Sequence, residues 1–305
     1  MPPLRTGLAA GVAAYLLWGL FPLYWPLLEP AAPVEILAHR IVWSLVFLAA
    51  LLALTMGFRW IPRLGRRRAG LLVLAAVLVT VNWGMYIYGV NSGHVVETSL
   101  GYFINPLVTV ALAVTVLGER LSRPQQLAVL IAAVAVAVLT IDYGRPPWIA
   151  LTLAFSFGTY GLIKNRAGVG GMQSLAFETA VLVIPALGYL AWLGGGTFTT
   201  EGPGHAALLA LGGVVTAVPL MMFGAAAIRI PLATLGVLQY LAPVLQFLIG
   251  VAIYDESMPA SRLAGFGLVW IALVVFTYDA IRGARAAPLA AGGEPGGAAP
   301  ALAER

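Results

Sequence analysis

Hydrophobic residues run in long stretches along this chain, and short polar segments separate them. A helix needs about 20 apolar residues, with a range of roughly 17–25, to cross the hydrocarbon core of a membrane. By this rule the pattern predicts ten membrane-spanning helices, at residues 7–28, 34–56, 70–90, 97–117, 124–142, 147–164, 173–193, 206–227, 232–253 and 261–280. We therefore expect an all-α polytopic membrane protein with mostly short connections and a retained first span rather than a cleaved leader.

The composition agrees with a membrane protein. Hydrophobic residues make up 61% of the chain and charged residues 10%, whereas soluble domains carry about 25% charged residues. The chain has no cysteine, which excludes a disulfide framework and a thiol nucleophile. Its net charge of +5 comes from basic residues in short loops, so we expect membrane lipid and no nucleic acid as a partner.

The basic residues predict the orientation. With both termini inside, the inner segments hold fourteen lysines and arginines, the outer ones hold Arg145 and Arg262, and Arg40 lies within a helix. Loops rich in lysine and arginine stay in the cytoplasm. The prediction is a multi-pass plasma-membrane protein with both termini cytoplasmic.

Residues 97–142 and 233–279 form an internal sequence repeat, with an offset of 137 positions. The matching pairs are Pro106 with Pro243, Glu119 with Glu256, Thr140 with Thr277, and Asp142 with Asp279. Because each half has an odd number of helices, five, the second half must cross the membrane in the opposite orientation to the first. This arrangement predicts an inverted-topology repeat, the usual basis of alternating access in secondary transporters.

The repeat divides the chain into three parts. Residues 1–144 and 145–282 are the two predicted five-helix units. Residues 283–305 are rich in Ala, Gly and Pro, and we expect a disordered cytoplasmic tail there.

Three strings resemble a known family: YLLWGLFPLY at 15–24, EILAHR at 35–40 and SLGYFINPL at 99–107. The chain is similar there, and across residues 7–282, to the RarD branch of the EamA family in the drug/metabolite transporter superfamily. The resemblance implies a basket of ten helices, with spans 1–4 and 6–9 around a central cavity and spans 5 and 10 at the periphery. It also implies export or exchange of a small metabolite. The chloramphenicol-sensitivity label common in this branch does not define the natural solute.

The densest polar cluster is Glu35, His39 and Arg40 in the second span, where Arg40 lies about 8–9 Å below Glu35 along the helix. A charge at the centre of a membrane helix costs at least about 2.5–3.5 kcal/mol, so these side chains should face the interior. Arg40 could receive an anionic or carbonyl group of a solute. The alternative is an internal ion pair of Arg40 with Glu35 or Glu178.

Three residues are candidates for proton coupling: Glu35, His39 and Glu178. Burial favours the neutral form of an acid, and histidine titrates nearest physiological pH. For Glu178, the alternative is a neutral, hydrogen-bonded carboxyl with a structural role only.

Further polar side chains lie beside two prolines that could break helices. A proline removes one backbone donor, and interrupted helices at matching positions of two repeats indicate a transporter site. Here the prolines are Pro106 and Pro243, and the alternative is an ordinary packing kink. The predicted substrate-binding residues are Trp18, His39, Arg40, Asn82, Tyr86, Tyr102, Asn105, Gln239 and Tyr240.

The repeated acids Glu119 and Glu256 are predicted to be structural, because each lies between two helices near a membrane surface. Ser122 with Gln125 forms a capping-box pattern, and Ser257 stands similarly before the next helix.

These features favour a secondary transporter of a small organic solute that works by alternating access. The alternative from a different class is a membrane-embedded enzyme acting on a lipid or peptide. The chain lacks a serine nucleophile elbow, a zinc-binding H-E-x-x-H helix and a phosphate-binding loop. We therefore expect no enzyme activity, no metal, no cofactor and no ATPase partner, in a monomer or homodimer.

Overall fold

The structure is a computed structural model that describes residues 2–55, 57–117, 121–227 and 238–291. These residues contain helices and no strand. The main α-helices are α1 (Pro2–Gly19), α2 (Phe21–Tyr24), α3 (Pro33–Thr55), α4 (Arg66–Asn91), α5 (Val95–Leu117), α6 (Arg123–Tyr143), α7 (Trp148–Ala167), α8 (Gly171–Trp192), α9 (Gly196–Thr200), α10 (Pro203–Ala227), α12 (Leu241–Ala252) and α13 (Ala260–Ala291). Two short 3₁₀ helices, η1 (Trp25–Leu28) and η2 (Ile61–Arg63), complete the described elements.

Every predicted span contains a helix, and six helices are long and apolar enough to cross a membrane: α3, α4, α6, α8, α10 and α13. A seventh crossing results if α1 and the bent segment after it form one span. α7 and α12 are shorter apolar helices. The all-helical membrane class is thus confirmed. Of the ninth predicted span, residues 232–237 lie outside the described residues.

The first span is not the single helix that the hydrophobic pattern predicted. The chain bends by 44° between Arg5–Gly19 and Phe21–Leu28. Pro22 and Pro26 stand at the starts of the two short helices after the bend, and neither can donate a backbone hydrogen bond to the preceding turn.

The prediction of a disordered segment from residue 283 was wrong for residues 283–291. α13 continues to Ala291, in agreement with the alanine content there, since alanine has the highest helix propensity. Residues 292–305 lie outside the described residues.

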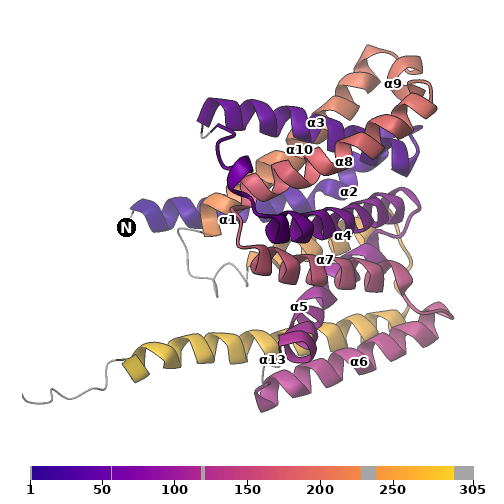
Figure 1. Cartoon of the computed structure of the whole chain (residues 1–305). Coiled ribbons are helices and arrows are strands. Elements are labelled where there is room, and N and C mark those ends of the chain that lie inside the picture. The colour runs from indigo at the N-terminus through magenta and orange to yellow at the C-terminus, as the bar shows by residue number, and fades with distance from the viewer. Residues whose placement is uncertain (1, 56, 118–120, 228–237, 292–305) are drawn as a thin grey trace, which may run out of the picture.

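The helices pack in a regular set of pairs. α6 lies beside α13 along one side of the bundle, and α5 connects this pair to α7 and α12 (Figure 1). On the other side, α3 packs against α8 and α10, while α1 packs against α10 and α12. α4 contacts α7, α3 and α8.

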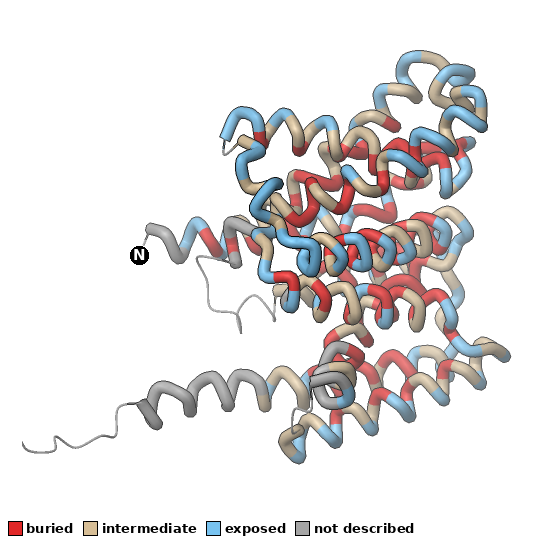
Figure 2. Tube along the Cα trace, viewed as in Figure 1, coloured by how far each residue is buried: buried red, intermediate tan, exposed pale blue. Residues whose placement is uncertain are grey.

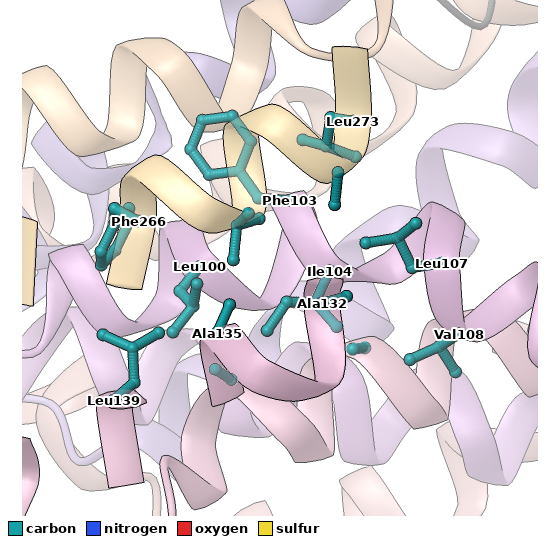
Figure 3. Packing of buried hydrophobic residues seen from close by; sticks show 14 of the residues in the cluster. Leu100, Phe103, Ile104, Leu107, Val108, Ala132, Ala135, Leu139, Phe266 and Leu273 are labelled. Carbon is teal, nitrogen blue, oxygen red and sulfur yellow. The ribbon is translucent and has the colours of Figure 1, made fainter. Parts of the chain in front are cut away.

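Buried residues gather where the helices face one another, and exposed residues lie on the outward surfaces (Figure 2). One apolar cluster joins α5, α6 and α13 through side chains such as Phe103, Leu139 and Phe266 (Figure 3). Large apolar side chains also point outward, including Ile141 and Ile184, which are 82% and 75% exposed. Such a surface suits lipid contact rather than water.

Candidate functional site

Arg40 on α3 is the centre of the candidate site. It is only 4% exposed, and its Nε donates a 2.7 Å hydrogen bond to Thr216 Oγ1 on α10. The guanidinium carbon lies 4.1 Å from the ring centre of Trp83, 5.1 Å from that of Trp25 and 6.0 Å from that of Phe21. Cation–π attraction from these rings stabilises the charge.

The ion pair suggested for Arg40 is not formed. Among the described residues, no carboxylate lies within salt-bridge distance of Arg40. Glu35 accepts hydrogen bonds from Thr197, and Glu178 pairs with Lys164. Leaving one buried charge without its counter-ion is costly, and the described groups that offset this cost are Thr216 and the three rings.

Two further donors beside Arg40 have no partner. Trp25 Nε1 and the Tyr86 hydroxyl are buried, and neither forms a hydrogen bond within the described part of the chain. An unmade hydrogen bond at a buried donor costs about 1–3 kcal/mol. Tyr86 lies within electrostatic range of Arg40, and its ring packs 5.6 Å from that of Tyr102. The donors therefore surround the same small region as the guanidinium.

Asn82 fixes one wall of this region. Its Nδ2 donates to the Leu153 carbonyl at 3.0 Å and to Ser156 Oγ at 3.1 Å, both on α7. Its Oδ1 accepts a 3.3 Å hydrogen bond from the Tyr102 hydroxyl. The structure thus brings Arg40 together with Asn82, Tyr86 and Tyr102, four residues that the sequence assigned to a substrate site.

Glu35 and His39 lie at the start of α3 and contact the short helix α9. Thr197 donates to Glu35 from its backbone N–H at 2.7 Å and from its hydroxyl at 2.8 Å. The His39 ring stacks on Phe198, with centres 4.7 Å apart. Phe198 was absent from the sequence prediction, because it lies in a short polar connection between two spans.

Glu178 on α8 is fully buried and has three side-chain donors. Ser174, Lys164 and Tyr160 donate to its carboxylate at 2.6, 2.9 and 3.0 Å. Glu178 is therefore tied to α7 in an ion pair, rather than paired with Arg40 or held as an isolated neutral acid.

Of the remaining predicted site residues, Trp18 packs against the apolar cluster that contains Phe21, Trp25 and Tyr86, and residues 239–240 directly precede α12. The Trp18 carbonyl accepts a 3.1 Å hydrogen bond from Gln246, and its ring packs on Tyr15. Tyr240 hydrogen-bonds to Gln239 and to Thr277 on α13, so Tyr240 faces α13. Asn105 is half-buried on α5.

The predicted helix break at Pro106 was wrong, whereas the ninth predicted span is interrupted just before Pro243. α5 runs as an α-helix through Pro106, which a membrane helix tolerates when its surroundings satisfy the freed carbonyl. Near Pro243, Leu238 is helical, residues 239–240 form a turn, and α12 begins at Leu241. Pro243 lies in the first turn of α12, where a missing N–H costs no helical hydrogen bond.

Carboxylates at helix ends form a second polar group. Glu256 accepts hydrogen bonds from the N–H groups of Val95 and Val96 at the start of α5, which agrees with the structural role predicted for it. Burial raises the pKa of Glu256, and these two N–H groups offset part of the rise. Glu119, its repeat partner, lies outside the described residues.

Glu97, which the sequence reading missed, has an equivalent role at the start of α7. It accepts from the Ile149 N–H at 3.1 Å and pairs with Arg145 at 2.9 Å. The position of Glu97 in the first turn of a predicted span was the only sequence feature that could have indicated this structural role. Glu97 and Glu256 also line a polar cavity of about 290 Å³ with His94, Arg145 and Arg262.

The paired aspartates of the repeat connect α6 and α13 reciprocally, each through side-chain donors at the start of the other helix. Asp142 near the end of α6 accepts from Ser261 and, at 2.9 Å, from Arg262 at the start of α13. Asp279 on α13 accepts a 2.7 Å hydrogen bond from Ser122, the N-cap of α6. The predicted capping box of Ser122 and Gln125 is present, whereas α13 begins at Ala260, so Ser257 stands before its cap position.

Comparisons with known proteins agree with this architecture. Residues 5–141 match the EamA-like transporter family. The chain is 60% identical to Protein RarD of Streptomyces exfoliatus, over 92% of this chain and 91% of that protein. It is 42% identical to the uncharacterized transporter YojE of Bacillus subtilis, over 92% of this chain and 97% of that protein. It is also 39% identical to Protein RarD of Escherichia coli, over 91% of this chain and 95% of that protein.

A protein of known crystal structure shares the fold, with a TM-score of 0.58 at 18% identity over 88% of this chain and 96% of that one. Apolar helices around a buried polar cluster, together with these relatives, define a multi-pass membrane transporter. The chain belongs to the EamA-like transporter family, in the RarD branch of the drug/metabolite transporter superfamily.

Proposed function

We propose that the protein is a secondary carrier that moves a small organic solute across the bacterial plasma membrane by alternating access. The observation that carries this proposal is the buried Arg40 guanidinium, which has no carboxylate partner among the described residues. A buried charge of this kind lowers the stability of the protein, and charged residues inside membrane spans usually have a function that explains why they are kept.

The surroundings of Arg40 indicate the chemistry of the solute. The guanidinium, Trp25 Nε1 and the Tyr86 hydroxyl are all donors, and the last two lack partners among the described residues. A carboxylate or other oxygen-rich group would accept hydrogen bonds from all three. The rings of Trp83 and Phe21 beside Arg40 would contact an apolar or aromatic part of the same solute.

Alternating access rests on an inverted repeat of two five-helix units, residues 1–144 and 145–282. Two observations support it. First, the helix contacts of one half recur in the other: α5 with α7 corresponds to α12 with α1, and α4 with α7 corresponds to α10 with α1. Second, the repeated aspartates make matching contacts: Asp142 accepts from Arg262 at the start of α13, and Asp279 accepts from Ser122 at the start of α6. Such symmetry allows two equivalent conformations that open to opposite sides.

The positive-inside pattern supports cytoplasmic termini. In that orientation the α8–α10 connection with α9, the Glu97–Arg145 pair and the α12–α13 connection face outward. Proton coupling through Glu35, His39 or Glu178 stays a prediction. Solute uptake that does not respond to an imposed pH gradient would exclude it.

Metabolite profiling of cells and medium tests the proposed function. Cells that produce the protein should differ from cells that produce Arg40→Ala in how one solute divides between cytoplasm and medium. An enzyme would instead change which compounds are made. Equal distribution of every detected compound in the two strains would contradict a carrier role for Arg40.

A further inference from the structure

The short helix α9 lies at the end of the bundle where α8 and α10 are joined (Figure 1), and it is anchored to the start of α3. Thr197 donates to Glu35 through both its backbone N–H and its hydroxyl. The acceptor is 3% exposed, so both hydrogen bonds form in a largely water-free place. His205 on α10 lies 2.9 Å from the same Thr197 hydroxyl.

The next residue of α9 covers the candidate site. The Phe198 ring stacks on His39, with centres 4.7 Å apart and planes 17° apart, and lies 6.2 Å from the ring of Trp43. Phe198 also packs against the apolar cluster that contains Trp25, one of the rings around Arg40. His39 directly precedes Arg40 in α3, and Trp25 contacts Arg40, so α9 packs against residues next to Arg40.

Glycines flank α9 on both sides. Gly194, Gly195 and Gly196 have φ angles of 70°, 93° and 52°, and Gly202 has a φ of 87°. These left-handed conformations are readily accessible only to glycine. A Cβ at Gly196 would also collide with the Glu35 carboxylate. The same glycines thus permit a hinge on each side of α9 and a close contact between α9 and Glu35.

We propose that α9 is a gate over the Arg40 site, with Phe198 as its closing residue, Glu35 as its latch and the flanking glycines as its hinges. This inference rests on the proposed function, because a gate needs a solute path beneath it. It gives Glu35 a task other than solute or proton binding. In the conformation of this structure the latch is engaged and Phe198 blocks the approach to His39.

The gate is testable by cysteine labelling, since the chain contains no cysteine of its own. A His39→Cys reporter, beneath Phe198, is labelled with fluorescein maleimide in nanodiscs, which expose both membrane faces. The same reporter is then combined with Glu35→Ala, which removes the latch, or with the milder Thr197→Val, which removes only the hydroxyl donor. A Thr200→Cys reporter is the matched control, because Thr200 is exposed on α9.

Loss of the charge-assisted hydrogen bonds from Thr197 to Glu35 should raise the labelling rate of the His39→Cys reporter about tenfold in Glu35→Ala, which corresponds to about 1.4 kcal/mol. Thr197→Val should give a smaller rise, and the Thr200→Cys control should not change. Equal rates for the His39→Cys reporter with and without the Thr197→Val change, or with and without Glu35→Ala where that variant folds, would overturn the gate. Because labelling needs no transport, this result would leave the role of Arg40 to be decided separately.

Discussion

The crossing of α3 and α10 determines the position of Arg40, and Gly213 on α10 is its point of closest approach. A Cβ at Gly213 would overlap the carbonyl carbon of Trp43 and lie 2.6 Å from its oxygen and 2.7 Å from the Ser44 nitrogen. Those atoms are backbone and cannot rotate away. At the neighbouring Gly212, an added Cβ would meet only the Tyr24 hydroxyl, at 3.6 Å. Small residues commonly permit such close crossings in membranes.

Gly213→Ala and Gly212→Ala therefore differ in packing but little in helix propensity. Each should gain about 0.5–1 kcal/mol, because alanine favours the helix more than glycine does. At Gly213, ordinary carbon contacts of about 3.5–4.0 Å require the two helices to separate by about 1 Å, and overpacking of this kind costs about 1–3 kcal/mol. The separation would also stretch the 2.7 Å bond from Arg40 to Thr216.

Thermal unfolding in detergent, followed by tryptophan fluorescence, measures the difference. At about 2–4 °C per kcal/mol, Gly213→Ala should melt at least about 2 °C below Gly212→Ala, and Gly212→Ala should melt at or above the wild type. A Gly213→Ala protein that melts with or above Gly212→Ala would show that the α3–α10 crossing is not packed as described.

Three further predictions concern the polar contacts. Lys164→Met should destabilise the protein by about 3–5 kcal/mol, because it leaves Glu178 charged and buried. The double variant with Lys164→Met and Glu178→Met should recover most of this loss in a thermal melt. No recovery in the double variant would argue against the ion pair. Asp142→Ala and Asp279→Ala should each cost about 1 kcal/mol through lost side-chain hydrogen bonds between α6 and α13. Their effects should add, because the two aspartates lie at opposite ends of the α6–α13 pair; strong non-additivity in thermal melts would contradict two separate contacts. The raised pKa of Glu256 means that the folded protein holds a proton more tightly than the unfolded chain. Its contribution to stability should be full below the unfolded pKa of about 4.3 and be lost as pH rises through the higher folded pKa. Melting curves across this range should show that slope in the wild type, and an equal slope in Glu256→Gln would refute the assignment.

The spans and the central cluster were predictable because simple physical limits fix them. The membrane sets the length of each apolar stretch, and the cost of a charge in lipid places Arg40 in the interior. The bend in the first span was partly visible, since Pro22 and Pro26 lie within the apolar stretch. A hydrophobicity count treats those prolines as apolar and does not register the donors that they lack.

The partners of the buried charges could not be read from the sequence. Glu178 on α8 meets Lys164 on α7 because both helices pack against α4. Glu35 meets Thr197 across 162 positions of the chain. Phe198 was missed for a related reason, since its short connection has no periodic pattern. The reciprocal contacts of Asp142 and Asp279 could have been predicted, because the two aspartates repeat at the same spacing as the rest of the duplicated segment.

Transport of the solute by purified protein in liposomes tests the central claim most directly. The solute found by profiling is loaded inside, and its exchange is followed for the wild type, Arg40→Ala and Tyr102→Ala, each checked for a monodisperse folded protein. Our account predicts exchange by the wild type and none by the two variants. Wild-type exchange by both variants would contradict a solute site built around Arg40 and α5.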